Sequence, residues 1–269
     1  MDTAALIEFT QALVRVPSVN YAGRREEPAA DLVAGLMRSW GWTPVIEPVA
    51  PGRPNVHAVL EGDRPGPTLL FGGHTDVVTE GSGWSVDPFG AQIRDGRLYG
   101  RGSADMKGGL AAMLFAAREV QTGGFAGRIV VAAFADEEGM MLGSKHFAAR
   151  HAAGIDGAIV CEPEAEEICL TAKGALRLRI DAHGAMAHGA MPEHGRNPLP
   201  VLGRVLAELG RLQERMQAEA GVDEHLGRPY LTPTVLRAGD PDQLNVIPAE
   251  AWLGVDVRTV PGQDHGEIV

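Results

Sequence analysis

Before about residue 173, the hydrophobic residues follow two patterns that alternate along the chain, one typical of helices and one typical of strands. Apolar residues that recur every three or four positions, or that lie on nearly all faces of a segment, predict helices at 4–14, 29–40, 107–120 and 144–151. Short apolar runs flanked by glycine or proline predict strands at 44–49, 55–60, 68–71, 129–134 and 157–161. The strands 129–134 and 157–161 are continuously apolar, which is typical of buried strands. Helices that alternate with such strands predict an α/β fold, a three-layer αβα domain around a mixed sheet.

The pattern changes near Gly174. Residues 175–182 alternate between apolar and charged side chains, which predicts a strand with one solvent-facing side. A stripe of leucines predicts a long amphipathic helix over 199–216, and further strands fit 231–236 and 251–257. Residues 262–269 fit the beginning of another helix. We therefore expect the αβα domain over residues 1–173 and a smaller α+β domain over residues 174–269.

The composition narrows the classes of function. The formal net charge of -11 argues against a nucleic-acid-binding surface and against binding to anionic membranes. The sequence has no apolar run of about 18 residues, and its start lacks the basic and apolar regions of a secretion signal. Only Cys161 and Cys169 are present, so neither a disulfide framework nor a thiolate zinc site is expected. We expect a cytoplasmic protein.

Four groups of acidic or imidazole side chains are candidates for the ligand site that open α/β sheets place at the ends of their strands. The first is His74-Thr75-Asp76, just after the strand 68–71. A histidine two residues from an aspartate suits a metal ligand whose second ring nitrogen is held by a carboxylate. Such a pair also occurs by chance, so alone it is weak support for a site.

The second group is the glycine-rich segment 100–109 around Asp105. Its glycines indicate a bent backbone that directs one carboxylate. Asp105 could also cap the alanine-rich helix that follows, and capping is compatible with metal binding. A phosphate-binding loop is discounted because Lys107 is followed by Gly108 rather than by serine or threonine.

The third and fourth groups are acidic. Residues 136–139 read Asp-Glu-Glu-Gly, and adjacent carboxylates repel one another unless a cation compensates them. Glu162 follows the next predicted strand. Each acid alone is more simply explained as part of a solvated turn. One histidine and several carboxylates at the ends of different strands, however, predict a two-metal centre for zinc, cobalt or manganese.

In order and spacing, these motifs resemble the zinc exopeptidase and deacylase family of acetylornithine deacetylase, succinyl-diaminopimelate desuccinylase and glutamate carboxypeptidase. The residues that carry the resemblance are His74-Thr75-Asp76, Gly102 to Gly109, Glu137-Glu138 and Glu162-Pro163. The resemblance implies two zinc ions per subunit, which cobalt can replace, and these metal ligands: His74, Asp105, Glu138 and Glu162.

The same resemblance implies roles for the neighbouring residues. Asp105 would bridge the two metal ions, and the peptide bond between Asp105 and Met106 would be cis, as in the family. Asp76 would orient His74. Glu137 would be the general base that takes a proton from the attacking water and passes it to the leaving nitrogen.

The smaller domain resembles the lid and dimerisation domain of that family, which implies a homodimer formed through the lid. In that family a lid histidine stabilises the tetrahedral oxyanion, often from the partner subunit. His188 is our candidate for this residue, ahead of His183 and His194. Asn245 and Arg258 resemble the lid's substrate-binding asparagine and carboxylate-binding arginine, and an arginine fork suits a carboxylate. Without the resemblance, His188 would be a loop histidine and Arg258 a surface residue.

We therefore expect a metal-dependent hydrolase that cleaves the amide bond of an N-acyl amino acid or a small peptide carrying a free carboxylate. The motifs do not choose among acetylated, succinylated and dipeptide substrates. Family members continue further and carry there one more histidine ligand, which His265 does not match. Both domains are thus expected to be incomplete at the C-terminus. The alternative is a truncated, inactive relative that folds and dimerises with an incomplete metal site.

Overall fold

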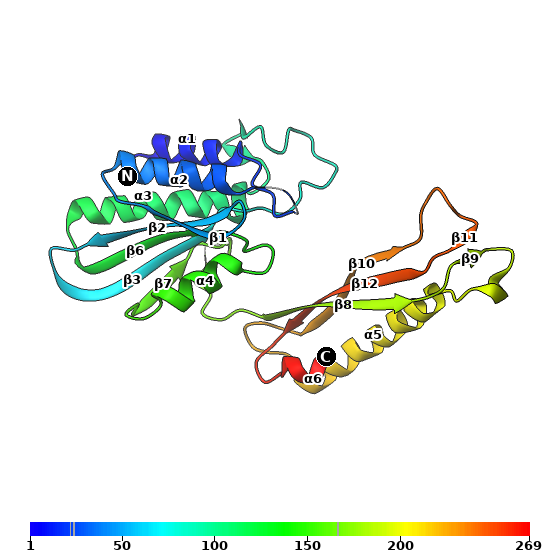
Figure 1. Cartoon of the computed structure of the whole chain (residues 1–269). Helices are drawn as coiled ribbons and strands as arrows, with labels where there is room; N and C mark the ends of the chain where they lie inside the picture. Colours follow the sequence, from blue (N-terminus) through cyan, green and yellow to red (C-terminus); the bar gives the residue numbers. More distant parts are fainter. Residues whose placement is uncertain (22, 24, 166) are drawn as a thin grey trace. The chain divides into compact units, whose positions relative to one another are not determined.

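The structure, a computed structural model, describes residues 1–21, 23, 25–165 and 167–269. The chain divides into two compact units, Met1–Glu167 and Ile168–Val269. Figure 1 labels the helices and strands of each unit. No helix in the described ranges is long and apolar enough to cross a membrane.

Unit 1 is built on a five-stranded sheet in the order β1-β2-β6-β3-β7. Its strands are β1 (Val45–Ala50), β2 (Arg53–Glu61), β3 (Arg64–His74), β6 (Ala126–Phe134) and β7 (Gly157–Val160). β2 pairs antiparallel with β1 and β6, whereas β3 is parallel to β6 and β7. The sheet is therefore mixed, and the carboxyl ends of β3, β6 and β7 lie at the same edge.

Helices cover both faces of this sheet (Figure 1). α1 (Thr3–Val14), α2 (Glu27–Ser39) and α3 (Gly108–Gly123) lie on one face and form the main core with β2 and β6. α4 (Leu142–His151) lies on the other face, where Phe147 packs against Val130, Ala132 and Phe134. Alternate side chains of β6 thus enter opposite layers, which explains why its apolar run is continuous.

Strand β7 corrects one expectation, since its apolar run predicts a buried strand. It lies at the edge of the described sheet, where Ile159 and Val160 are 50% and 57% exposed. An apolar run gives no information about the order of strands in a sheet, and that order decides which strand lies at an edge.

A short hairpin between β3 and α3 has no counterpart among the predicted elements. Its strands, β4 (Gln92–Arg94) and β5 (Arg97–Tyr99), have three residues each, too few to show a period. A short turn, Ser103–Lys107, then leads into α3, and the backbone angles of Asp105 and Met106 within it are not helical. The peptide bond between Asp105 and Met106 in this turn is cis, as expected.

Unit 2 is a three-stranded antiparallel sheet with one long helix packed against it. Its main elements are β8 (Gly174–His183), α5 (Leu199–Ala220), β10 (Tyr230–Ala238) and β12 (Glu250–Thr259). β12 lies between β10 and β8. Leu176, Leu178 and Ile180 face the core beneath α5, and the charged residues between them are exposed, as their alternation predicts.

Short elements complete unit 2. β9 (Ala187–His188) and β11 (Val246–Ile247) pair with each other, and α6 (His265–Ile268) follows β12. A 3-10 turn, Pro192–His194, lies between β9 and α5. The pairing of β9 with β11 is a contact between distant segments that the sequence pattern does not reveal.

Candidate metal centre

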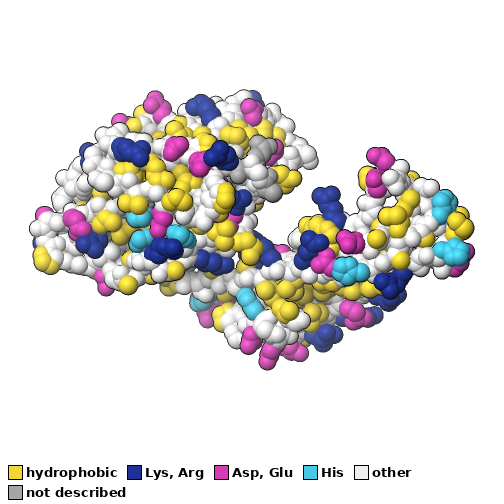
Figure 2. Space-filling view, viewed as in Figure 1, with side chains coloured by type: hydrophobic (Ala, Val, Ile, Leu, Met, Phe, Trp, Pro, Cys, Tyr) yellow, Lys and Arg dark blue, Asp and Glu magenta, His cyan; other side chains and the backbone are white. Residues whose placement is uncertain are grey.

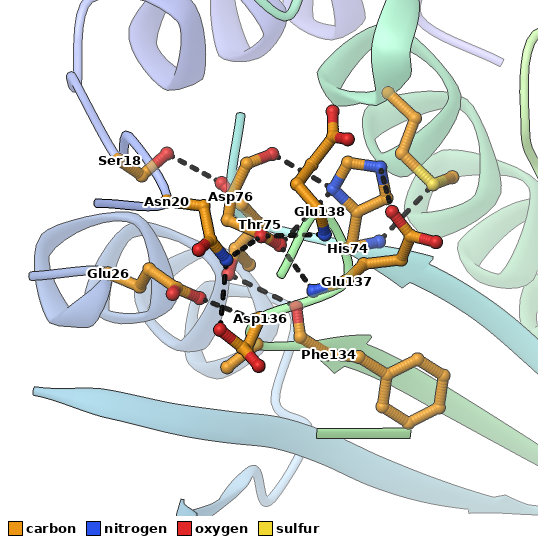
Figure 3. A network of polar contacts seen from close by, with 12 residues as sticks. Ser18, Asn20, Glu26, His74, Thr75, Asp76, Phe134, Asp136, Glu137 and Glu138 are labelled. Carbon is orange, nitrogen blue, oxygen red and sulfur yellow. Dashed lines mark hydrogen bonds and ion pairs between the residues drawn. The ribbon is translucent and has the colours of Figure 1, made fainter. Parts of the chain in front are cut away.

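His74 lies at the carboxyl end of β3 and is 1% exposed. Its Nδ1 lies 2.9 Å from the main-chain oxygen of Asp76 and 3.4 Å from the Asp76 carboxylate (Figure 3). Both oxygens favour the tautomer with a proton on Nδ1. Nε2 is then the nitrogen available to a cation.

The carboxylate of Asp76 also holds the loop that follows β6. Its oxygens accept hydrogen bonds from the main-chain N–H groups of Glu137, at 3.1 Å, and Glu138, at 3.0 Å. The side chain of Asn20 donates a third bond, at 2.6 Å (Figure 3). Burial raises the pKa of Asp76, but His74 and these donors outweigh burial and lower it. An ionised Asp76 therefore holds His74, Glu137 and Glu138 in fixed relative positions.

Three further carboxylates surround Nε2 of His74. The nearest oxygens belong to Asp105 at 3.3 Å, Glu162 at 3.7 Å and Glu137 at 3.9 Å. The donor atoms of His74, Asp105 and Glu162 lie within 4.8 Å of one another, as do those of His74, Glu137 and Glu138. Each set combines one imidazole with two carboxylates, which suits zinc, cobalt or manganese. The residues present therefore fit a metal centre.

The charges of this group also fit a bound cation. Burial and the neighbouring carboxylates raise the pKa of Glu162 to about 7 and that of Glu138 to about 6, although His74 opposes this effect. Burial lowers the pKa of His74, but Asp76, Glu162 and Glu137 outweigh it and raise the pKa to about 9. A divalent cation would stabilise the ionised carboxylates and displace the proton of the imidazole.

A buried polar network that no motif predicts lies behind the loop. Asp136, in the left-handed region with φ 62°, forms an ion pair with Arg53, which also lies 3.4 Å from Glu26. Glu26 accepts the main-chain N–H of Asp136 at 3.0 Å (Figure 3). Asp136 belongs to the acidic motif, but Glu26 and Arg53 lie far from every motif in the sequence. No local signal could have identified them.

The turn that carries Asp105 is anchored by Lys107. This buried side chain donates hydrogen bonds to the carbonyl oxygens of Leu13, at 3.0 Å, and Val16, at 2.7 Å. Burial lowers the pKa of Lys107 to about 7. The interpretation of Asp105 as a helix cap gains no support, since α3 begins without a side-chain capping bond among the described residues. The Asp105 carboxylate lies beside His74 instead.

The three candidate substrate-binding residues lie in unit 2. The pairing of β9 with β11 brings His188 and Asn245 together, with 3.4 Å between Nε2 of His188 and Nδ2 of Asn245. Arg258 lies on β12 and donates from Nε to the carboxylate of Asp256 at 2.8 Å. Its side chain is 45% exposed. His188 and Asn245 therefore lie side by side, whereas Arg258 pairs with Asp256.

Residues 70–259 match the family model of Peptidase family M20/M25/M40. The chain belongs to this family. The resemblance based on the four motifs is therefore confirmed.

Curated relatives in this family carry two of the expected names. The chain is 36% identical to the succinyl-diaminopimelate desuccinylase of Rhodospirillum centenum over 274 residues, covering 94% of this chain and 67% of the relative. It is 32% identical to the acetylornithine deacetylase of Proteus mirabilis over 263 residues, covering 95% and 67%. The chain spans about two thirds of the length of these relatives. Family membership and the two donor sets around His74 confirm a metal-dependent amide hydrolase.

Solved structures confirm the fold. A metallo-carboxypeptidase of the M20 family from Sulfolobus solfataricus superposes with a TM-score of 0.75 at 22% identity, covering 100% of this chain and 74% of that one. A di-peptidase from Saccharomyces cerevisiae gives 0.77 at 18% identity, covering 98% and 71%. At these identities the likeness concerns the α/β fold alone.

Proposed function

We propose that this protein hydrolyses the amide bond of a small N-acyl amino acid, of the N-acetyl or N-succinyl type, or of a small peptide. The observation that carries the proposal is the convergence of His74 with carboxylates from three separate segments. The names of the two curated relatives support the same substrate class. The alternative of an inactive relative gains no support from the residues that the structure describes.

The metal ligands in this proposal are His74, Asp105, Glu138 and Glu162, and the metal is zinc, with cobalt as a working substitute. His74 offers only Nε2 and can bind one ion, so a centre of two ions would need a shared carboxylate such as Asp105, with Glu138 as a ligand of the second ion. When bound, the metal would polarise the scissile carbonyl and make water a stronger nucleophile. The Asp76 carboxylate would keep His74 in the tautomer that binds metal.

Glu137 is the general base in this proposal. Its main-chain N–H is fixed by Asp76, whereas its side chain is 35% exposed and lies beside the donors around His74. A carboxylate in this position can take a proton from water and deliver it to the leaving nitrogen. Glu138 shares the same anchor, so exchanging the two roles is the most direct competing assignment.

We further propose that residues 1–173 form the catalytic domain and that residues 174–269 form a lid and dimerisation domain. His188 and Asn245 would contact the substrate near the oxyanion, and Arg258 would bind its carboxylate. The pairing of His188 with Asn245 supports a shared task. Nearby Leu244 and Met186 are 93% and 67% exposed, which supports a contact surface for a homodimer. The low number of cysteines supports a cytoplasmic location.

The proposal is tested by incubating the protein with zinc or cobalt and N-acetylornithine, N-succinyl-diaminopimelate or a dipeptide. Release of a primary amine from at least one of them is expected. The corresponding methyl ester, which lacks the free carboxylate, should react more slowly. If metal binds but none of the three substrates is hydrolysed, the proposed function is wrong.

A further inference from the structure

A second group of metal-binding side chains lies on the α4 face of the unit 1 sheet, outside the contacts of His74. Donor atoms of Glu47, His57 and His151 all lie within 4.8 Å of one another. They come from β1, β2 and the last residue of α4. Histidine side chains gather beside acidic and basic ones on the face of unit 1 drawn in Figure 2.

The strand register explains why these residues meet. His57 pairs with Ala132 of β6, whose side chain faces α4. On β1, Val45 is the partner of His57, and Glu47 lies two residues further on the same face. α4 crosses this face and places His151 against both strands, with the rings of His57 and His151 5.0 Å apart.

One distance between two of the proposed ligands suits a tetrahedral ion. Oε2 of Glu47 lies 3.3 Å from Nε2 of His151, and Oε1 lies 3.1 Å from Nε2 of His146. Ligand atoms at about 2.0–2.1 Å from a tetrahedral zinc ion are about 3.3–3.4 Å from one another. The separation of Glu47 from His151 therefore matches two ligands of one ion.

His57 supplies an independent indication of a ligand. Its side chain is 8% exposed, and its buried Nδ1 has no hydrogen-bond partner among the described residues. A buried polar atom without a partner is costly, so such an atom needs an explanation. A cavity of about 240 Å³ lined by His57, Arg150 and His151 gives access to the group.

We propose that Glu47, His57 and His151 form a second metal site for a divalent transition-metal ion, with zinc as the best match to one carboxylate and two imidazoles. Nε2 of His146 lies near the other oxygen of Glu47. The ion connects the end of α4 to β1 and β2. The competing explanation is a metal-free ion-pair network, because Nε of Arg150 lies 3.6 Å from the same carboxylate.

The test measures the zinc retained per chain after gel filtration, with zinc as the only added metal. His57→Phe keeps an aromatic ring without a donor nitrogen, and His151→Asn changes a partly exposed residue, so at least one variant should fold normally. Each variant should lose one zinc ion per chain. Arg150→Gln is the matched control, because it removes the ion pair to Glu47 but no proposed ligand, and it should retain that ion.

A background variant separates this site from the candidate active site. In Asp105→Asn with Glu138→Gln, one zinc ion per chain should remain, and adding His151→Asn should remove it. Cobalt in this background should give the visible absorption of a tetrahedral site, and His151→Asn should abolish it. Unchanged zinc content in both His57→Phe and His151→Asn would overturn the proposal. An equal loss of zinc in Arg150→Gln would also overturn it, because the loss would then not depend on the proposed ligands.

Discussion

At the scale of single residues, the candidate site depends on one buried carboxylate. Asp76 contacts Nδ1 of His74 and accepts the main-chain N–H groups of Glu137 and Glu138. It therefore connects the end of β3 to the loop after β6. A change at Asp76 should alter the orientation of several site residues together, although Asp76 is not itself a proposed ligand.

Asp76→Asn is expected to weaken zinc binding by about 10- to 100-fold, the usual effect of removing a carboxylate that supports a ligand histidine. The amide keeps the size of the side chain but presents an NH2 group to donors that need an acceptor. Competition with a chelator would measure the affinity. Asn20→Ala removes only one donor to Asp76 and should have a smaller effect. Unchanged affinity in Asp76→Asn would show that Asp76 does not support His74.

Arg258→Met is expected to raise KM for a substrate with a free carboxylate by about 10- to 100-fold, since a hydrogen bond to a charged group contributes about 1.5–3 kcal/mol. Arg177→Met is the matched control, because Arg177 lies 4.0 Å from the same Asp256 but has no proposed contact with substrate. Steady-state kinetics would compare the two variants. Equal KM values would contradict the role of Arg258.

The buried Glu26 predicts a pH dependence of stability in the metal-free protein. Burial, and then the charge of Asp76, raise its pKa from 4.5 to about 8, although Arg53 opposes them. In the pH window between these two pKa values, Glu26 of the folded protein keeps a proton that the unfolded chain has released. The free energy of unfolding should therefore fall as pH rises through the window.

Glu26→Gln should flatten this pH dependence, because its amide oxygen can still accept the main-chain N–H of Asp136 and cannot ionise. Urea denaturation at both ends of the window would compare the variant with the parent protein. Parallel pH profiles would show that Glu26 does not cause the effect.

At the scale of elements, helices and strands with many residues were predictable and contacts between distant segments were not. The period of 175–182 and the leucine stripe of 199–216 gave β8 and α5 to within a few residues, because one face of each is buried. The three-residue strands β4 and β5 carry no period. The ends of apolar strands indicated where His74 and Glu162 lie, whereas the supporting pair of Glu26 and Arg53 depends on tertiary packing alone.

The start of α3 packs tightly against the chain that follows β7. A Cβ atom added at Gly109 would lie 2.1 Å from the carbonyl oxygen of Cys161, whereas one at Gly123 would have no atom within 4 Å. Gly109→Ala should therefore lower the free energy of unfolding by about 1–3 kcal/mol. Gly123→Ala should be neutral or stabilise by up to about 1 kcal/mol. Urea denaturation would compare them, and equal stability would contradict the close packing of α3.

At the scale of the whole molecule, each unit contributes different chemistry to the proposed hydrolase. Every proposed metal ligand and the proposed base lie in unit 1, and every proposed substrate-binding residue outside the metal centre lies in unit 2. Metal content and turnover are therefore separable readouts. The metal centre around His74 is proposed to work with Glu137, a general base that is not itself a metal ligand.

The most direct test of this claim compares Glu137→Gln with Glu138→Gln, two isosteric changes at adjacent residues with the same anchor. Zinc content and amide hydrolysis would be measured on the same preparations. Glu137→Gln should retain its zinc and lose about 10²- to 10⁴-fold in kcat, the usual contribution of a general base. Glu138→Gln should lose zinc. The account is contradicted if Glu137→Gln remains active, or if it loses as much zinc as Glu138→Gln.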